Sequence, residues 1–165
     1  MSKKILALIV FSFLASAVLL TLWYWRSNPE RQIRKTLTTM AELGSSPVGE
    51  SSIAKAVKSQ KLGDYFSEDA FIEWPGDEVI PSGRWTGRDN IIQQVLAAKN
   101  SANYSVLLDD LSIEANRRQV RAGAQFTLVV REGLDTWAWL AKADLLKAGR
   151  RWSATRVIFT PILRR

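Results

Sequence analysis

Cysteine and histidine are both absent from the 165 residues of this chain. Without cysteine there can be no disulfide, no thiolate nucleophile and no cysteine-ligated metal. Without histidine there can be no Ser-His-Asp or Cys-His relay, no imidazole base and no histidine-based zinc site. Any catalysis would have to use Asp, Glu, Lys or Tyr with pKa values shifted by their surroundings. We therefore expect neither a metal nor a cofactor.

Charge is absent from residues 5–25, an apolar stretch bracketed by Lys4 and Arg26. A helix of this length reaches about 30 Å, the thickness of the hydrocarbon core of a bilayer. The stretch closes on Trp23, Tyr24 and Trp25, and aromatic rings of this kind prefer the headgroup level. We predict a basic tail over residues 1–4, a transmembrane signal-anchor over residues 5–25 and a juncture over residues 26–28.

A cleavable signal peptide is the alternative, with residues 15–17 as a small-residue cleavage site. Cleavage after Ala17 would leave an apolar new N-terminus, which favours an uncleaved anchor. The basic residues on the two sides, counted alone, favour a cytoplasmic domain, but a long domain can cross the membrane regardless of its charges. Because a short basic head before a first apolar segment is typical of a signal-anchor, we expect an extracytoplasmic domain.

The net charge is +7, and Lys3 and Lys4 account for two of these charges, which leaves +5 for the rest. Basic and acidic residues are interspersed, and only Arg150-Arg151-Trp152 approaches the basic and aromatic pattern of a nucleic-acid surface. We therefore expect no nucleic-acid partner. A solvated basic face close to anionic headgroups is the simpler interpretation.

The first part of the domain has helical periodicity. Asn28 can cap a helix that has Pro29 at its first position. An apolar stripe at helical spacing follows, which consists of Ile33, Leu37, Met40 and Leu43. A second helix is expected from near Ser51, with Ile53 and Val57 as its apolar positions and Tyr65-Phe66 as its last apolar turn.

A short strand is predicted over residues 70–74, followed by a loop that contains Pro81 and Gly83. Thr86 and Asp89 have the spacing of a capping box for a third helix. From residue 104 apolar residues alternate with polar ones, over residues 104–113, 120–130, 136–147 and 152–163. Helices followed by a meander of strands predict an α+β domain with helices packed on one face of a curved sheet.

Two segments carry a family resemblance: SEDAFIEWPG at residues 67–76 and GRWTGRDNII at residues 83–92. They resemble the nuclear transport factor 2-like superfamily, which includes SnoaL-like and ketosteroid-isomerase-like proteins. The resemblance covers residues 29–163 and implies one domain over residues 29–165, with a cone-like curved antiparallel or mixed sheet and about three helices. This fold hosts isomerases, hydrolases, cargo adaptors and assembly modules, so it implies little about activity.

Ketosteroid-isomerase-like members place a proton-abstracting Asp immediately before the Pro of this motif, and here that position is Trp74. A second acid–base position, often His in SnoaL-like enzymes, has no counterpart in a chain without histidine. These departures argue against that chemistry, and we assign no catalytic residue.

The mouth of the cone implied by the resemblance can hold an apolar ligand. The aromatic candidates for its lining are Tyr65, Trp74, Trp85, Trp137 and Trp139, and the candidate polar anchors are Glu73, Asp110 and Arg156. The aromatic residues could instead fill the cone as core. Trp137 and Trp139 could also form a subunit contact, because superfamily members commonly dimerise through the outer face of the sheet. Arg156 lies between apolar neighbours, so it would need an acidic partner if it were buried.

The sequence thus favours a membrane-tethered, non-catalytic domain that binds a small apolar ligand or a protein partner at the envelope, in a bacterial cell membrane by resemblance. The possible partners are the bilayer, through residues 5–25, a second copy of the chain, through the outer face of the sheet, and an envelope protein. The alternative is a histidine-free isomerase or hydrolase that uses Asp or Glu in the pocket.

Overall fold

The computed structural model describes Ser16 and residues 28–76, 82–115, 120–149 and 151–162. Within this part of the chain no helix is both long enough and apolar enough to cross a bilayer. The predicted membrane span, residues 5–25, lies outside the described residues apart from Ser16, as do residues 26 and 27 of the juncture. The anchor and the cleavage alternative therefore stay predictions.

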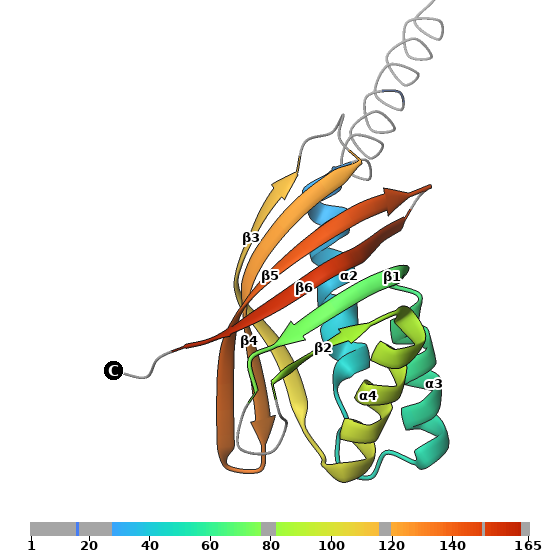
Figure 1. Cartoon of the computed structure of the whole chain (residues 1–165), viewed down its shortest axis with the longest axis vertical. Helices are drawn as coiled ribbons and strands as arrows, with labels where there is room; N and C mark the ends of the chain where they lie inside the picture. The colour runs from blue at the N-terminus through green and yellow to red at the C-terminus, as the bar shows by residue number, and fades with distance from the viewer. Residues whose placement is uncertain (1–15, 17–27, 77–81, 116–119, 150, 163–165) are drawn as a thin grey trace, which may run out of the picture.

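The described residues form an α+β fold in which helices lie on one side of a strongly curved sheet (Figure 1). In chain order the elements are α2 (Pro29–Gly44), α3 (Ser52–Gly63), β1 (Phe66–Trp74), β2 (Gly83–Thr86), α4 (Arg88–Ser101), β3 (Ser105–Ala115), β4 (Arg121–Glu132), β5 (Asp135–Ala148) and β6 (Arg151–Pro161). Helix α2 packs against β3, α4 packs against β1, and α3 contacts both other helices. The predicted plan of three helices on one sheet is confirmed.

The sheet is mixed and has the strand order β2-β1-β6-β5-β4-β3. Strand β1 pairs in parallel with β6, and every other pair is antiparallel. The last strand of the chain therefore lies beside the first, and α4, the one helix between β1 and β3, packs against β1. The long partners β4, β5 and β6 give the sheet its curved wall (Figure 1).

Helix α2 begins as the sequence predicts. The Asn28 side chain accepts a hydrogen bond from the Glu30 backbone N–H at 3.1 Å, which satisfies one of the unpaired donors of the first turn. Ile33, Leu37 and Ala41 are buried on the face toward the sheet. Helix α3 differs from the prediction, because Ile53 and Val57 are exposed and its buried residues are instead Ser59, Leu62 and Gly63.

The segment around the first strand also differs from its prediction. Phe66 is the first residue of β1 and is buried, so it does not belong to a last turn of α3. Residues 83–86 form the short strand β2, antiparallel to β1, whereas the sequence placed Gly83 in a loop and predicted no strand there. The pattern of these four residues alone could not predict a strand, because they form strand hydrogen bonds only with β1.

The cap of α4 is Gly87 and not Thr86, which is the last residue of β2 and pairs with Phe71. Gly87 has a φ of 87°, a conformation that glycine adopts without steric cost, and no side chain caps the helix. Its backbone N–H donates to the carbonyl of Ala70 at 2.8 Å, so the turn from strand to helix is fixed to β1.

In β3 the apolar positions switch from even-numbered to odd-numbered residues, as the sequence indicates. Val106 and Leu108 share a face, and the next apolar residues are Leu111 and Ile113. The pairing with β4 shifts register between Asp109 and Ser112, and Asp110 there has a φ of 53°. This β-bulge places the apolar residues on both sides of it on the inner face.

Candidate functional site

A cavity of about 640 Å³ lies between the inner face of the sheet and helices α2 and α4. Its lining is mostly apolar and comes from Leu37, Met40, Ala41, Gly44, Leu62, Phe66, Ile72, Trp74, Trp85, Gln94, Val95, Ala98, Ser101, Ala102, Tyr104, Val106, Leu108, Phe126, Leu128, Val130, Glu132, Trp137, Trp139, Val157 and Phe159. The cone is therefore not completely filled by its own side chains.

Aromatic side chains from β1, β2, β5 and β6 form one wall of the cavity. Trp74 stacks on Trp85 with ring centroids 6.5 Å apart, and it tilts against Trp139 at 4.7 Å. Trp74 and Phe159 make an edge-to-face contact with ring centroids 5.1 Å apart. Offset and edge-to-face pairs of this kind are favourable beyond the area that they bury, so this wall is fixed in shape.

The exposed members of the lining mark the opening of the cavity. Gln94 and Ser101 of α4 are exposed, as are Glu132 and Trp137 at the hairpin between β4 and β5. Trp137 has 39% of its surface exposed, whereas Trp139, two residues further into the same face, has 7%. The opening is therefore on the side of the β4–β5 hairpin, the end of the domain opposite to the start of α2 (Figure 1).

Few polar groups reach the cavity wall. The indole N–H of Trp74 is buried and has no hydrogen-bond partner among the described residues. Burial, together with the nearby negative charge of Glu50, raises the pKa of the Tyr104 hydroxyl to about 12. Tyr104 therefore stays neutral at physiological pH. Of the described lining residues, only Tyr104 and Glu132 can ionise.

The structure brings four of the predicted site residues together, namely Trp74, Trp85, Trp137 and Trp139, which all line the cavity. Because Trp137 and Trp139 share this lining with helical residues, they face the helices and not the outer face of the sheet. The predicted dimer through that outer face stays a prediction, and these two residues do not contribute to it.

The other predicted site residues lie outside the cavity lining. Tyr65 joins α3 to β1, and its carbonyl accepts from the Ala154 N–H at 2.8 Å. Glu73 forms an exposed ion pair with Arg84 of β2, with 3.8 Å between the charged atoms. Asp110 is exposed at the bulge of β3. Arg156 is exposed as well and pairs with Asp144 of β5 at 2.6 Å, so it is not a buried charge.

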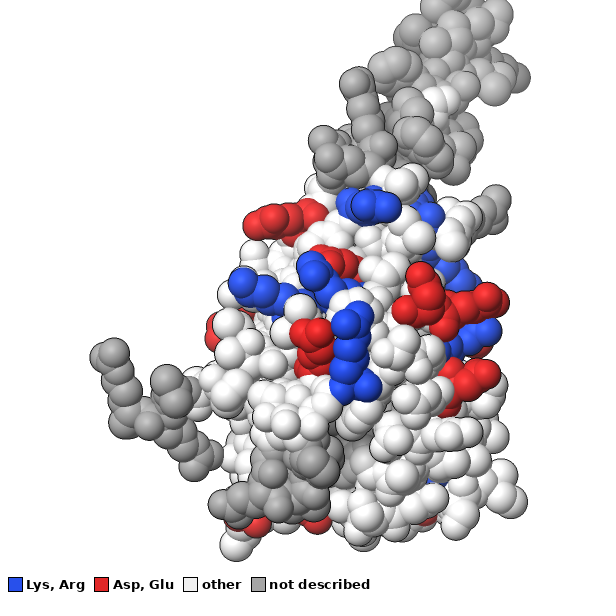
Figure 2. Space-filling model, in the orientation of Figure 1, with Lys and Arg blue, Asp and Glu red and all other residues white. Residues whose placement is uncertain are grey.

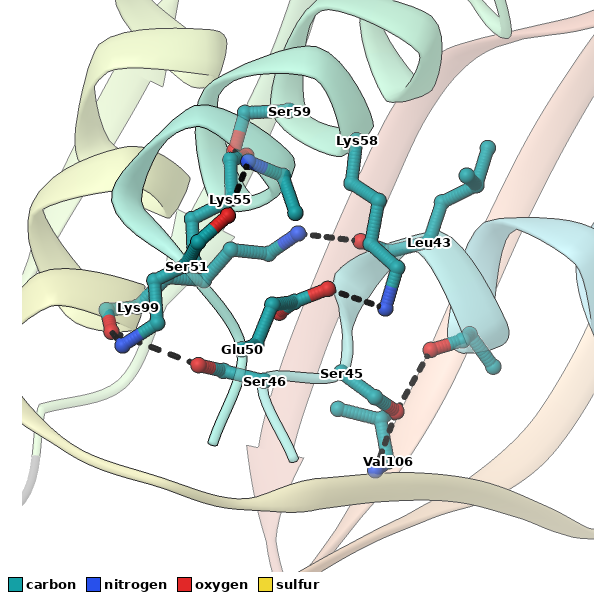
Figure 3. Close-up of polar contacts among 12 residues, drawn as sticks. Leu43, Ser45, Ser46, Glu50, Ser51, Lys55, Lys58, Ser59, Lys99 and Val106 are labelled. Atoms are coloured by element: carbon teal, nitrogen blue, oxygen red, sulfur yellow. Dashed lines mark hydrogen bonds and ion pairs between the residues drawn. The ribbon is translucent and has the colours of Figure 1, made fainter. Parts of the chain in front are cut away.

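A group of polar and charged side chains, most of them buried or partly buried, lies where the end of α2, α3 and α4 meet (Figure 3). We call this group, Ser46, Glu50, Lys55, Lys58 and Lys99, the polar cluster. Lys99 of α4 is fully buried, and its Nζ donates to the carbonyl of Leu43 at the end of α2. Lys58 pairs with Glu50 at 2.6 Å, and Lys55 donates to the Lys99 carbonyl at 2.6 Å.

Burial lowers the pKa of Lys99 to about 8, because the charged ammonium loses its hydration, while Glu50 opposes this shift. One oxygen of Glu50, Oε2, is buried without a hydrogen-bond partner. The polar cluster joins α4, the end of α2 and the segment before α3. It thus fixes the helical wall of the cavity.

The polar cluster could not be found from the sequence, since lysines at helical positions usually lie on the surface. The lining residues of α4 and β4, such as Val95 and Phe126, could have been found from the inward periodicity of their elements. The described residues contain no grouping of three or more acidic side chains that could hold a metal ion.

No family model matches the sequence, and no curated protein matches it either. Solved structures do match. An NTF2-like protein with a cystatin-like fold from Novosphingobium aromaticivorans is 14% identical, with 90% of this chain and 89% of that chain covered and a TM-score of 0.64. A candidate dehydratase of the NTF2-like family from Streptomyces avermitilis is 12% identical, covers 81% and 96%, and has a TM-score of 0.64.

A candidate scytalone dehydratase from Novosphingobium aromaticivorans is 13% identical, with 81% of this chain and 83% of that chain covered and a TM-score of 0.60. At such low identity these similarities define the fold and nothing finer. The chain has the fold of the NTF2-like, or cystatin-like, proteins, and the expected superfamily resemblance is supported at the level of fold.

Proposed function

We propose that this domain binds a small apolar molecule in its cavity and does so as a non-catalytic module tethered to the cell membrane. The observation that carries the proposal is the cavity of about 640 Å³ between α2, α4 and the inner face of the sheet. Ligand pockets in proteins commonly measure about 300–1,000 Å³ and are mostly apolar with a few polar groups. An unfilled apolar space of this size costs packing contacts unless something occupies it.

The chemistry of the lining favours a neutral ligand. A charged group in this cavity would lose its hydration, and the described lining has no cation that could compensate an anion. The polar groups available to such a ligand include the neutral Tyr104 side chain and the unpartnered indole N–H of Trp74. The stacked pair Trp74–Trp85 offers a flat surface for an apolar skeleton.

A histidine-free isomerase or hydrolase is the alternative function, and two structural neighbours are described as candidate dehydratases. That function would need an acid–base group against the ligand. Glu132 stands at the exposed opening, and Glu73, Asp110 and Asp144 lie outside the described lining. The binding function therefore has the stronger support.

The tether is proposed from the sequence, through the uncharged residues 5–25, with the domain outside the cytoplasm. Carbonate extraction of membranes from cells that express the full chain tests the tether, and retention in the membrane fraction is expected. A reporter fused after Arg165 tests the orientation, and activity only in the cytoplasm would contradict it.

Occupancy of the cavity can be tested with a plugging variant. A Cβ added at Gly44 would lie 3.9 Å from Val106, and both residues line the cavity. Gly44→Phe should therefore fill this space without a steric clash at the backbone. Gly123→Phe is the matched control, because Gly123 lies outside the cavity lining with no atom within 4 Å of an added Cβ.

The measurement uses the full chain in lipid nanodiscs and the apolar fluorophore N-phenyl-1-naphthylamine as probe. Quenching of tryptophan fluorescence should report binding, since four tryptophans line the cavity. We expect Gly44→Phe to weaken binding at least about tenfold, about 1.4 kcal/mol, and Gly123→Phe to leave it unchanged. Equal binding by both variants would mean that the probe does not occupy the cavity.

A further inference from the structure

One end of the domain gathers basic side chains from elements that are far apart in the sequence. Helix α2 begins at this end, β3 and β5 finish there, and β4 and β6 start there (Figure 1). We call the basic side chains that these elements contribute the basic end. They are Arg31, Arg34 and Lys35 from α2, Arg121 from β4, Lys147 from β5 and Arg151 from β6.

Several contacts hold these elements together. The Trp152 indole N–H donates to the Gln32 side chain at 3.2 Å, which joins the start of β6 to the first turn of α2. Trp152 pairs with Lys147, whose ammonium lies 5.9 Å from the Trp152 ring. The Lys147 N–H donates to the carbonyl of Val120, next to Arg121, at 2.7 Å. The basic end is therefore one surface on a rigid framework.

The charge of this surface is not balanced by its acidic neighbours. Glu30 pairs with Arg34 at 3.4 Å, but both side chains are half exposed, so the pair is weak. Glu114, near the end of β3, is the other acidic residue of the described elements at this end. Figure 2 shows Lys and Arg side chains at this upper end of the domain, with acidic side chains beside and below them.

The length of the chain fixes how far this surface can be from the proposed anchor. The chain from residue 25 to Pro29 can reach at most about 14 Å. The first turns of α2 would therefore lie close to the headgroups, at a distance comparable with the Debye length of about 8 Å at physiological salt. Basic side chains near an anionic bilayer surface are attracted to it.

We propose that the basic end binds anionic phospholipid headgroups and holds the domain upright on the bilayer, with the opening of the cavity turned away from the membrane. This inference rests on the proposed tether. The opening lies at the β4–β5 hairpin, at the other end of the domain (Figure 1). The cavity would then exchange its ligand with the aqueous side, and not laterally with the lipid core.

The absence of cysteine makes a direct test simple, because one introduced cysteine gives one labelled site. Ala148→Cys places a fluorophore at the basic end, and Leu134→Cys places it at the exposed β4–β5 hairpin. The full chain is incorporated into nanodiscs of phosphatidylcholine, with or without phosphatidylglycerol. Energy transfer to a headgroup-labelled lipid then reports the distance of each site from the bilayer.

We expect anionic lipid to raise transfer from position 148 roughly twofold and to leave position 134 unchanged or lower, and about 0.5 M salt to cancel the increase. Arg121→Glu combined with Lys147→Glu and Arg151→Glu should abolish it. The control reverses the same number of charges elsewhere, at Lys61, Arg131 and Lys142, which are exposed and outside the cavity lining. That control should keep the increase.

The possible outcomes separate the two proposals. If the chain elutes with the nanodiscs but position 148 ignores lipid charge, or both triple variants behave alike, the orientation is wrong and the tether stands. If the chain does not elute with nanodiscs, the tether fails and the orientation fails with it. If only the basic-end variant loses binding to a duplex oligonucleotide while its lipid signal is unchanged, the surface binds nucleic acid instead.

Discussion

The cavity and the polar cluster are neighbours, yet they are built in opposite ways. Gly44 and Ala98 line the cavity, while the adjacent Leu43 and Lys99 form a contact of the polar cluster. The cavity leaves apolar space unfilled. The cluster combines the fully buried Lys99 with the nearly buried Glu50 and the partly exposed Lys58, and it pairs these charges with carbonyls and one carboxylate.

The difference follows from what each kind of burial costs. An apolar wall that faces an empty space loses dispersion contacts but no strong interaction. A buried ammonium without a partner would lose its hydration entirely, so it must be paired or must release its proton. The helical wall can therefore be held firmly by the polar cluster while the space beside it stays open for a ligand.

Among the substitutions proposed here, removal of the Glu50 carboxylate should have the largest effect on stability. The Glu50 side chain is 6% exposed and is the only acidic partner within the polar cluster. Glu50→Ala would leave Lys58 and Lys99 without their compensating charge, and we expect a loss of about 3–5 kcal/mol in the free energy of unfolding. Urea unfolding followed by tryptophan fluorescence measures it.

Glu73→Ala is the control for this change, since Glu73 also pairs with a cation across 3.8 Å but keeps 43% of its side chain exposed. Exposed pairs contribute at most about 1 kcal/mol. Equal losses for the two variants would show that the burial of Glu50 has no energetic consequence, and would refute the role given to the cluster.

Lys99 should make stability depend on pH in an unusual direction. Its pKa is about 8 in the folded protein and 10.5 ordinarily. Between these values the unfolded chain holds a proton that the folded protein has released, so stability rises with pH by at most about 1.4 kcal/mol per unit. Above about pH 10 the raised pKa of Tyr104 acts in the opposite sense.

Lys99→Met keeps the approximate volume and removes the titration. The free energy of unfolding of the natural chain minus that of the variant should increase from pH 8 to pH 10. This difference reports the proton that Lys99 binds in the unfolded chain and has released in the folded protein. A difference that stays flat over this range would mean that Lys99 keeps an ordinary pKa.

Trp152, outside the cavity lining, and Trp74, in the lining, should also respond differently to loss of the indole N–H. Trp152 is 1% exposed and donates to Gln32, so Trp152→Phe should cost about 2 kcal/mol. The N–H of Trp74 has no partner and its ring faces the cavity, so Trp74→Phe should cost less than about 1 kcal/mol. Thermal unfolding of both variants decides this, and the reverse order would contradict an open cavity.

Much of the fold could be predicted because its signals are local. The Asn28 cap, the stripe of α2 and the alternation of β4 to β6 each depend on residues close in sequence, and the structure confirms them. Strand β2 and the burial of Phe66 depend on pairing with distant segments. Such pairing leaves no periodic trace in four or five residues.

In the candidate site, too, some residues could be predicted from the sequence and others could not. Trp74, Trp85, Trp137 and Trp139 line the cavity, as the family resemblance suggested, although the sequence alone left core packing and a subunit contact open as alternatives. The polar anchors could not be predicted, since burial of a charge depends on which elements close over it. Arg156 is exposed between apolar neighbours, whereas Lys99 is buried on a helix that its sequence would leave solvated.

The smallest effect is expected where the sequence predicted burial wrongly. Ile53 of α3 is 79% exposed, whereas the same helix buries Leu62 and is joined to the Lys99 carbonyl by Lys55 and to Glu50 by Lys58. Ile53→Ala should therefore change the free energy of unfolding by no more than about 0.5 kcal/mol. Ile91→Ala, at a site with no exposed surface, serves as the control and should cost about 3 kcal/mol. A loss at Ile53 close to that at Ile91 would show that α3 is held by an apolar face, and that the polar cluster is not its main attachment.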